Sequence, residues 1–274
     1  MGSSEALVGA LRAAGCVFAE EEAEVLAASA GSAEELEAML ARRVAGVPLE
    51  HVVGWAEFRG LRIVVEDGVF VPRRRTELLV AQGLALARMR SRPQAEPGAV
   101  IVDLCCGSGA VATALAAELP GAEVHAADVD PAAVRCARRN LEPRGGHVHE
   151  GDLDAALPAD LRGRVDLLLA NAPYVPTAEV PLMPPEARDH EPLTALDGGA
   201  DGLDLHRRIA ALAPRWLRPG GHLLIETSQR QAPGTAAAMV VHGMGTAMTR
   251  SEELDATVVI GISAGVSRRR RSST

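Results

Sequence analysis

The sequence predicts an α/β protein in which a mostly parallel sheet follows a small helical domain. Apolar runs such as Val100–Leu104 and Val165–Ala170 have the length and composition of strands buried on both faces. Each run ends in a polar or glycine-containing corner, where sheets of this kind bind their ligands. Residues 1–61, in contrast, read as helices and contain no catalytic motif.

The helical part is predicted to hold three helices, over residues 5–14, 19–30 and 33–45. Ser32 is expected to cap the third helix, with Glu35 completing a capping box. We interpret residues 1–61 as a substrate-recognition domain, although a cap that only stabilises the fold would have the same pattern.

Two further segments are expected to lie between the helical domain and the catalytic domain, one as a linker and the other as a lid over the substrate. Residues 63–65 and 69–71 predict a hairpin in a linker over residues 62–80. The proline-rich residues 176–192 are long for a loop in a compact domain, which favours a lid over the substrate. This loop carries four acidic residues, namely Glu179, Glu186, Asp189 and Glu191.

The catalytic domain is predicted over residues 81–266, and its glycine-rich loop follows Val100–Leu104 and opens a helix at 110–119. Gly107, Gly109 and Ala112 match the G-x-G-x-x-G/A spacing that lets a nucleotide approach the backbone closely. By itself this spacing fits a nicotinamide enzyme as well as an S-adenosylmethionine enzyme. The residues predicted to bind the cofactor here are Cys105, Cys106, Gly107, Ser108 and Gly109.

Neighbouring carboxylates decide between these cofactors. Asp103 stands directly before the loop, where an anion would repel a pyrophosphate and attract the ammonium of a methionine. Asp128 comes about 20 residues after the loop, where its carboxylate would receive two ribose hydroxyls. Asp152 and Leu153 follow the strand-like residues 147–150 and are expected to contact the adenine. The set favours S-adenosylmethionine.

The tetrapeptide Asn171-Ala172-Pro173-Tyr174 follows Val165–Ala170 and contains the only tyrosine of the chain. The Asn171 side-chain oxygen, also assigned to cofactor contact, and the Ala172 carbonyl could accept the hydrogens of an amide or amino group. Pro173 stiffens the corner, and Tyr174 could pack on the substrate plane. We predict that all four residues are catalytic and orient a nitrogen for direct in-line methyl transfer. A strand that simply ends in a turn is the alternative.

Strands near residues 222–226 and 256–263 would complete the sheet with a late antiparallel hairpin, and residues 267–274 are expected to form a disordered basic tail. Taken together, several segments resemble the protein-(glutamine-N5) methyltransferases that modify peptide chain release factors. The resemblance implies a seven-stranded Rossmann-like class I methyltransferase sheet, S-adenosyl-L-methionine as cofactor and a release factor glutamine as substrate. The segments are residues 48–60, 71–77, 103–109, 128–131, 171–174, 195–203 and 219–226.

The chain also departs from this family at several positions. Ala172 replaces a proline in the corner, Arg74 and Arg75 replace a proline and a glutamate, and Ser228 replaces a glycine. The Ala172 carbonyl is retained, so the acceptor survives, while the added bases suggest a divergent branch with another target.

The amino-acid composition excludes some classes of function but does not identify the function. The 274 residues are 47% hydrophobic, enough for an α/β core with a small accessory domain. A net charge of -8 argues against stable, sequence-independent binding of nucleic acid. Neither a signal peptide nor a long apolar span is seen, which predicts a cytoplasmic location and no membrane partner. The four cysteines have no spacing that predicts a zinc site or a disulfide framework, so no metal is expected.

Two other function classes share these motifs. An enzyme that methylates an exocyclic amine of a nucleic acid, adenine N6 or guanine N2, would use the same corner, but would need a basic or aromatic surface. A protein that binds S-adenosylmethionine without catalysis is also compatible with the altered corner.

Overall fold

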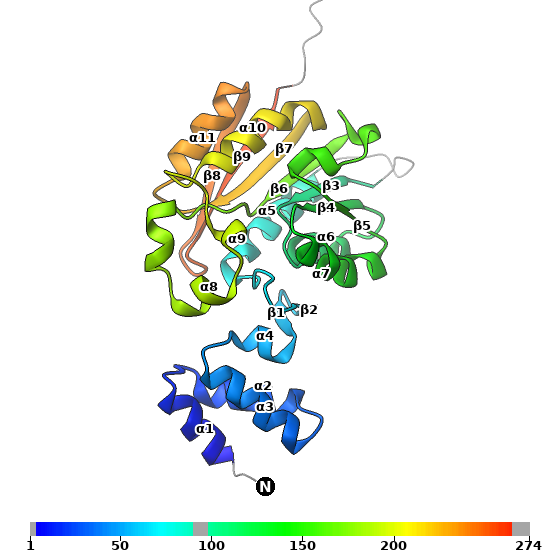
Figure 1. Ribbon diagram of the computed structural model, residues 1–274. Coiled ribbons are helices and arrows are strands. Elements are labelled where there is room, and N and C mark those ends of the chain that lie inside the picture. The colour runs from blue at the N-terminus through cyan, green and yellow to red at the C-terminus, as the bar shows by residue number, and fades with distance from the viewer. Residues whose placement is uncertain (1–3, 90–97, 265–274) are drawn as a thin grey trace, which may run out of the picture.

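The computed structural model describes residues 4–89 and 98–264. A hairpin of β1 (Trp55–Phe58) and β2 (Leu61–Val64) lies outside the main seven-stranded sheet (Figure 1). The strands of the main sheet are β3 (Val100–Leu104), β4 (Glu123–Asp128), β5 (His147–Glu150), β6 (Val165–Ala170), β7 (Leu217–Thr227), β8 (Met244–Ser251) and β9 (Ala256–Ser263).

Helices make up the N-terminal domain and flank the sheet. The first four are α1 (Ser4–Ala13), α2 (Ala19–Ser29), α3 (Ala33–Val44) and α4 (Leu49–Val53). The others are α5 (Glu77–Met89), α6 (Ala110–Glu118), α7 (Pro131–Leu141), α8 (Pro185–His190), α9 (Leu193–Leu196), α10 (Asp204–Trp216) and α11 (Ala232–Val241). Short 3-10 helices are η1 (Arg74–Thr76), η2 (Glu142–Arg144), η3 (Leu153–Ala156), η4 (Ala159–Leu161) and η5 (Thr177–Leu182).

The strand order of the main sheet, β5-β4-β3-β6-β7-β9-β8, creates one crevice at the centre of the molecule. Strands β3 to β7 are parallel, and only β9 runs antiparallel to its neighbours β7 and β8. The order reverses between β3 and β6, so the connections that leave these two strands diverge at their carboxyl ends. Open α/β sheets bind ligands at such a point. The seven-stranded fold and the late antiparallel hairpin are thus confirmed.

The alternation of side chains along the central strands builds two cores. Leu167 and Leu169 of β6 join the cluster that contains buried residues of α5, α6 and α7. Leu168 and Ala170 point the other way and pack in the cluster that contains α10 and α11. Because both faces are covered, the strand is apolar throughout rather than alternating.

The N-terminal helices are present, as the sequence predicts, and they form a small hydrophobic core with Leu11, Ala23 and Leu26 among its buried residues. The Ser32 hydroxyl accepts the backbone N–H of Glu35 at 3.1 Å. The Glu35 carboxylate accepts the N–H of Gly31 at 2.7 Å, one residue earlier than in a standard capping box.

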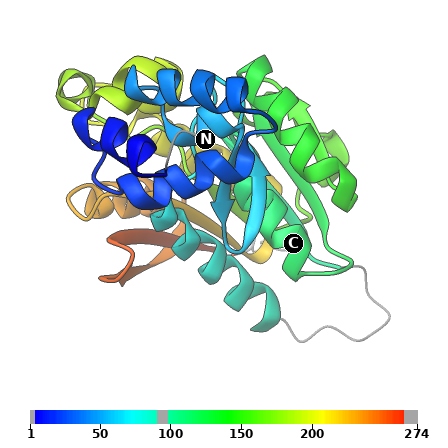
Figure 2. The same cartoon turned by 90° about the horizontal axis from the view of Figure 1, so that it is seen from below.

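A buried arginine joins this domain to the rest of the chain. Arg43 of α3 is 7% exposed and donates to Glu22 of α2 at 2.5 and 3.0 Å. It also donates to Glu186 of α8 at 2.6 Å. Figures 1 and 2 show the helical domain at one end of the molecule, with the segment that holds α8 beside it.

The placement of the predicted hairpin is wrong, because its strands lie earlier and residues 69–71 form no strand. Phe58 pairs with Leu61 across a two-residue turn, in which Arg59 and Gly60 have φ angles of 51° and 71°. Two positive φ angles indicate a type I′ hairpin turn. Arg-Gly is not the usual Asn-Gly signal for this turn, which explains why the sequence did not reveal it.

The proline-rich residues 176–192 are also not a loop without structure, since they contain η5 and α8. The basic tail at 267–274 lies outside the described residues, and the expected division into domains stays a prediction. No helix within 4–89 and 98–264 combines the length and apolarity needed to cross a membrane.

Candidate active site

The glycine-rich loop turns sharply between β3 and α6 because three of its residues have left-handed backbone. Cys105, Gly107 and Gly109 have φ angles of 56°, 53° and 74°. A Cβ atom on Gly109 would lie 3.0 Å from the Cβ of Ala137 in α7, so glycine permits this close approach of loop and helix. Cys105 adopts the conformation despite its side chain, and such strain is typical of ligand-binding loops.

Asp103 lies at the end of β3, beneath the loop. Its side chain is buried, and Oδ2 accepts the backbone N–H of Ala112 in the first turn of α6 at 3.1 Å. Burial raises the pKa of this carboxyl to about 7, although the Ala112 N–H opposes the shift. A cationic ligand group beside Asp103 would favour the ionised form.

Asp128 stabilises the glycine-rich loop through hydrogen bonds and also lines the pocket described below. Its Oδ2 accepts the N–H of Gly107 at 2.9 Å, and its Oδ1 accepts the N–H of Asp130 at 3.0 Å. Burial nevertheless raises its pKa. Each oxygen keeps a second lone pair, so the predicted contact with ribose hydroxyls adds to a structural role that sequence reasoning did not assign.

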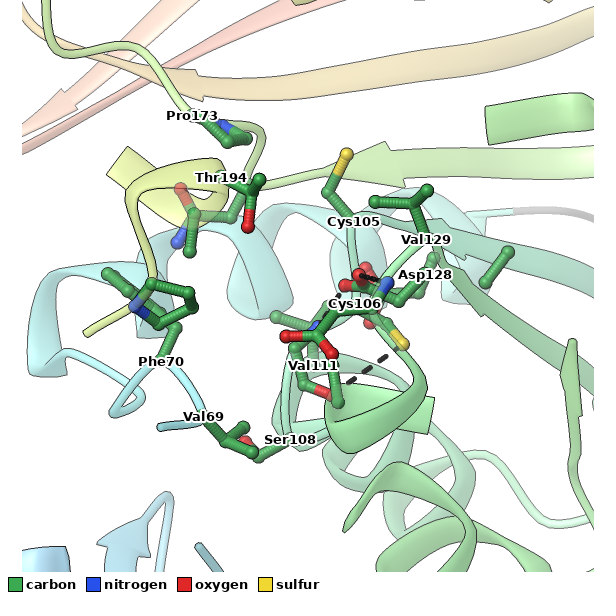
Figure 3. A pocket seen from close by; sticks show the side chains of 18 of the residues that line it. Val69, Phe70, Cys105, Cys106, Ser108, Val111, Asp128, Val129, Pro173 and Thr194 are labelled. Atoms are coloured by element: carbon green, nitrogen blue, oxygen red, sulfur yellow. Dashed lines mark hydrogen bonds between the residues drawn. The ribbon is translucent and has the colours of Figure 1, made fainter. Parts of the chain in front are cut away.

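A pocket forms around these groups at the carboxyl edge of the sheet (Figure 3). Val69 and Phe70 of the linker lie across it from Cys106 and Asp128. The predicted cofactor residues that line it are Asp103, Cys105, Cys106, Gly107, Ser108, Asp128, Asp152, Leu153 and Asn171. Gly109 does not line it and instead packs against α7. The pocket is also lined by Phe70 of the linker, by Pro192 at the end of the proline-rich segment and by Thr194 of α9. Sequence reasoning missed these three residues.

This cavity matches the chemistry of S-adenosylmethionine. Carboxylates stand at two places, Asp103 and Asp128, where the ammonium and the ribose could bind. Leu153 and Val129, which line the same pocket as Asp128 and Asp152, supply apolar surface for a flat base. Asp152 also pairs with Arg208 at 2.7 Å.

The Asn171 corner follows β6 at the same edge. The Asn171 Nδ2 donates to the Oγ1 of Thr76 at 3.2 Å, which leaves Oδ1 available as an acceptor. Thr76 is buried in η1, and its role was not foreseen although residues 71–77 belong to the family-like segments. If the strand simply ended in a turn, the hydrogen bond from the Asn171 amide to the buried Thr76 would not be needed.

The backbone of Tyr174 is held from behind by a glycine-containing segment. Gln231 Nε2 donates to the Tyr174 carbonyl at 2.8 Å. A Cβ on Gly198 would lie 2.7 Å from the Tyr174 Cα, and one on Gly202 would lie 2.2 Å from its carbonyl oxygen. The family-like residues 195–203 therefore serve to pack directly against the corner.

A second pocket opens on the other side of Asn171. It is lined by the corner residues 171–175 together with Arg73, Arg75, Met183 and Glu226. The residues that line both pockets are Phe70, Asn171, Pro173 and Ala195. A substrate nitrogen bound in the second pocket would thus meet a cofactor in the first at Asn171.

Ionic contacts secure the walls of the second pocket. Glu191 accepts two bonds from Arg73, at 2.7 and 2.8 Å, and one from the Val71 N–H at 3.0 Å. The Arg73 guanidinium also lies 5.0 Å from the centre of the Phe70 ring. The acidic residues of the proline-rich segment are therefore used within the chain, since Glu179, Glu186 and Asp189 also pair with arginines.

The arginines that depart from the family pattern differ in position. Arg74 faces away and pairs with Glu253 at 3.4 Å. Arg75 is exposed and lines the second pocket, where a substrate would pass.

Comparison with known proteins finds similar methyltransferases. Residues 61–183 match the methyltransferase small domain family. A methyltransferase from Pyrococcus furiosus shares the fold with a TM-score of 0.54 and 16% identity, covering 82% of this chain and 98% of that one. Fold and site together define an α/β methyltransferase.

Several curated relatives carry one name. A release factor glutamine methyltransferase of Streptomyces coelicolor is 47% identical over 70% of this chain and 67% of its own length. One of Mycolicibacterium smegmatis is 38% identical over 91% of this chain and 92% of its length. The 4-amino-L-phenylalanine/4-methylamino-L-phenylalanine methyltransferase of Streptomyces pristinaespiralis is 38% identical over 72% and 66%. The chain belongs to the release factor glutamine methyltransferase family.

Proposed function

We propose that the protein transfers a methyl group from S-adenosylmethionine to the side-chain amide nitrogen of a glutamine in a peptide chain release factor. The observation that carries the proposal is the position of Asn171 between the two pockets, with its Oδ1 available. Family membership supplies the choice of glutamine and of release factor as the first substrate to test.

The cofactor supplies an electrophilic methyl group, and the chain has to position a weak nucleophile in front of it. An amide nitrogen becomes reactive when acceptors hold its hydrogens and water is kept away. Asn171 Oδ1 and the Ala172 carbonyl are the proposed acceptors. Pro173 and Tyr174 wall the pocket, and Asp103 would attract the ammonium end of the cofactor.

The direct test is mass spectrometry of peptide chain release factors of the source organism after incubation with the protein and S-adenosylmethionine. A mass increase of one methyl group on a glutamine is expected. If release factors stay unmodified while another protein is methylated, the methyltransferase activity is supported and the release factor is not its substrate.

A second substrate class is suggested by the relative named for 4-amino-L-phenylalanine. The second pocket includes apolar walls from Phe70, Pro173 and Met183, which could take an aryl ring. Incubation with free 4-amino-L-phenylalanine therefore belongs in the same experiment. Methylation of this amine without any modification of protein would favour the small-molecule alternative.

A further inference from the structure

One buried acidic residue in the second pocket has no role so far. Glu226 is the penultimate residue of β7, so it lies at the same carboxyl edge as Asn171. It is 1% exposed, yet it lines the pocket together with Asn171, Ala172 and Tyr174. A charged residue at the end of the apolar run Leu223-Leu224-Ile225 is the sequence signal that could have singled it out.

The carboxyl group of Glu226 is not satisfied by the protein. Both oxygens are buried, and within residues 4–89 and 98–264 neither has a partner at normal hydrogen-bond geometry, although the Thr76 hydroxyl lies close enough to favour the ionised carboxyl. Burying an acceptor without a partner is unfavourable, and such groups in folded proteins commonly await a ligand or take part in catalysis.

The surroundings of Glu226 make it a candidate base near neutral pH. Burial raises its pKa to about 7, although the Thr76 hydroxyl and the Arg75 guanidinium near it favour the ionised form. Tyr174 is the other titratable neighbour, and its own pKa is raised by burial and then by the charge of Glu226. On β9, its register partner is the apolar Val258.

We propose that Glu226 is a catalytic residue whose carboxylate accepts an N–H of the target amide and takes up the proton released by methyl transfer. The inference rests on the proposed function and adds to it a proton acceptor. Asn171 and Ala172 offer only amide oxygens, which can orient the nitrogen but are too weakly basic to keep a proton.

The proposed step balances in atoms and charge. The amide nitrogen forms a bond to the methyl carbon, while the bond between that carbon and the sulfonium sulfur breaks and leaves its electron pair on sulfur. The N–H proton moves to an oxygen of Glu226. The products are a neutral thioether, a neutral N-methyl amide and a neutral carboxylic acid, which later releases its proton to solvent.

The test compares Glu226→Gln with the wild-type protein in single-turnover methylation of the release factor. Glutamine has the same shape, so folding and cofactor affinity should be retained. The rate constant at pH 8 should fall about 10²-fold, a typical contribution of a general base. Saturating cofactor is used throughout, because the pKa of Asp103 in the first pocket is also raised to about 7.

The dependence of the rate on pH separates catalysis from packing. The wild-type rate should rise through pH 7 as Glu226 ionises, and Glu226→Gln should lose this rise. Glu226→Asp keeps a carboxylate, so it should retain the rise at an intermediate rate. A Glu226→Gln protein with the wild-type rate and pH profile would overturn the inference while leaving the proposed function intact.

A measurement without turnover completes the test. In a protein with ¹³C-labelled glutamate carboxyl groups, one NMR signal should titrate near pH 7 and be missing from Glu226→Gln. A Glu226 signal that remains protonated at pH 8.5 would overturn the inference. If the wild-type protein methylates neither protein glutamine nor amine, the proposed function fails, and the role of Glu226 fails with it.

Discussion

Asn171 is oriented by Thr76, a residue 95 positions earlier in the chain. The hydrogen bond uses the Nδ2 of the amide, so the oxygen is the atom left for the substrate. Because a buried hydroxyl fixes the donor side, we propose that the acceptor is already oriented before the substrate binds. Such preorganisation lowers the barrier more than a flexible contact of equal strength.

Replacing Asn171 by alanine should therefore affect transfer rather than folding. We expect Asn171→Ala to retain the fold and most of the cofactor affinity, and to lower the single-turnover rate about 10²-fold or more. Ala172→Pro is the matched control, since it leaves the carbonyl in place and should be tolerated. An Asn171→Ala protein with the wild-type rate would exclude the corner from the mechanism.

Asp128 should control both cofactor affinity and loop stability. Asp128→Ala removes the acceptor for the N–H groups of Gly107 and Asp130 and for the ribose hydroxyls. We expect the binding of S-adenosylmethionine to weaken by about 1–3 kcal/mol. Isothermal calorimetry measures this, with NAD as the negative control. Tight binding of NAD and none of S-adenosylmethionine would contradict the cofactor assignment.

At the scale of elements, the outer edge of the sheet carries a cluster of histidines. His125 of β4 lies with its ring centre 5.0 Å from that of His147 and 5.2 Å from that of His149, both on β5. Its Nδ1 is 2.9 Å from the Nε2 of His149, and its Nε2 is 3.2 Å from Glu123. The cluster lies away from both pockets, which agrees with a packing role.

The histidine cluster should make the fold sensitive to acid. Burial lowers the pKa of His149 to about 4 and also lowers that of His125. The unfolded chain therefore binds more protons between about pH 6.5 and pH 4, so this contribution to stability is complete above pH 6.5 and is lost as the pH falls through that window.

Urea unfolding at several pH values measures the effect. Because the raised pKa values of Asp103 and Glu226 give the opposite dependence, the quantity to compare is the difference between wild type and His149→Gln. The wild-type protein should lose more stability on acidification than the variant. Parallel curves for the two proteins would argue against the cluster as the cause.

At the scale of the whole molecule, the helical domain and the sheet domain meet through a few defined contacts. Arg43 reaches Glu186 of α8, and His51 of α4 has its Nε2 2.8 Å from the carbonyl of Val69. Val69 itself lines the first pocket. The hairpin belongs to the larger body, because Phe58 and Ile63 are buried in the core that contains α5 to α7.

Removing residues 1–54 is therefore the cut that tests whether the helical domain recognises a protein. We expect the shortened protein to keep most of its cofactor affinity, since the predicted cofactor residues all lie beyond Val100, although the cut removes the His51 contact to the pocket residue Val69. It should lose methylation of the intact substrate. A short glutamine peptide should still be methylated. The control for the lost ion pair is Glu186→Gln in the full chain. If the shortened enzyme methylates the intact protein substrate as fast as the full chain does, the helical domain only stabilises the fold.

The sequence by itself determined the parts of this protein that depend on neighbouring residues: the apolar strands, the glycine loop after Asp103, the Ser32 cap and the Asn171 corner. Each follows from local backbone geometry and side-chain chemistry within a few positions. Only the tertiary structure decided which distant residues complete the site. Phe70 and Thr76 come from the linker and Glu226 comes from β7, and the fold brings these two distant segments to the crevice beside Asn171. No local pattern encodes that meeting, because it depends on the packing of the whole sheet.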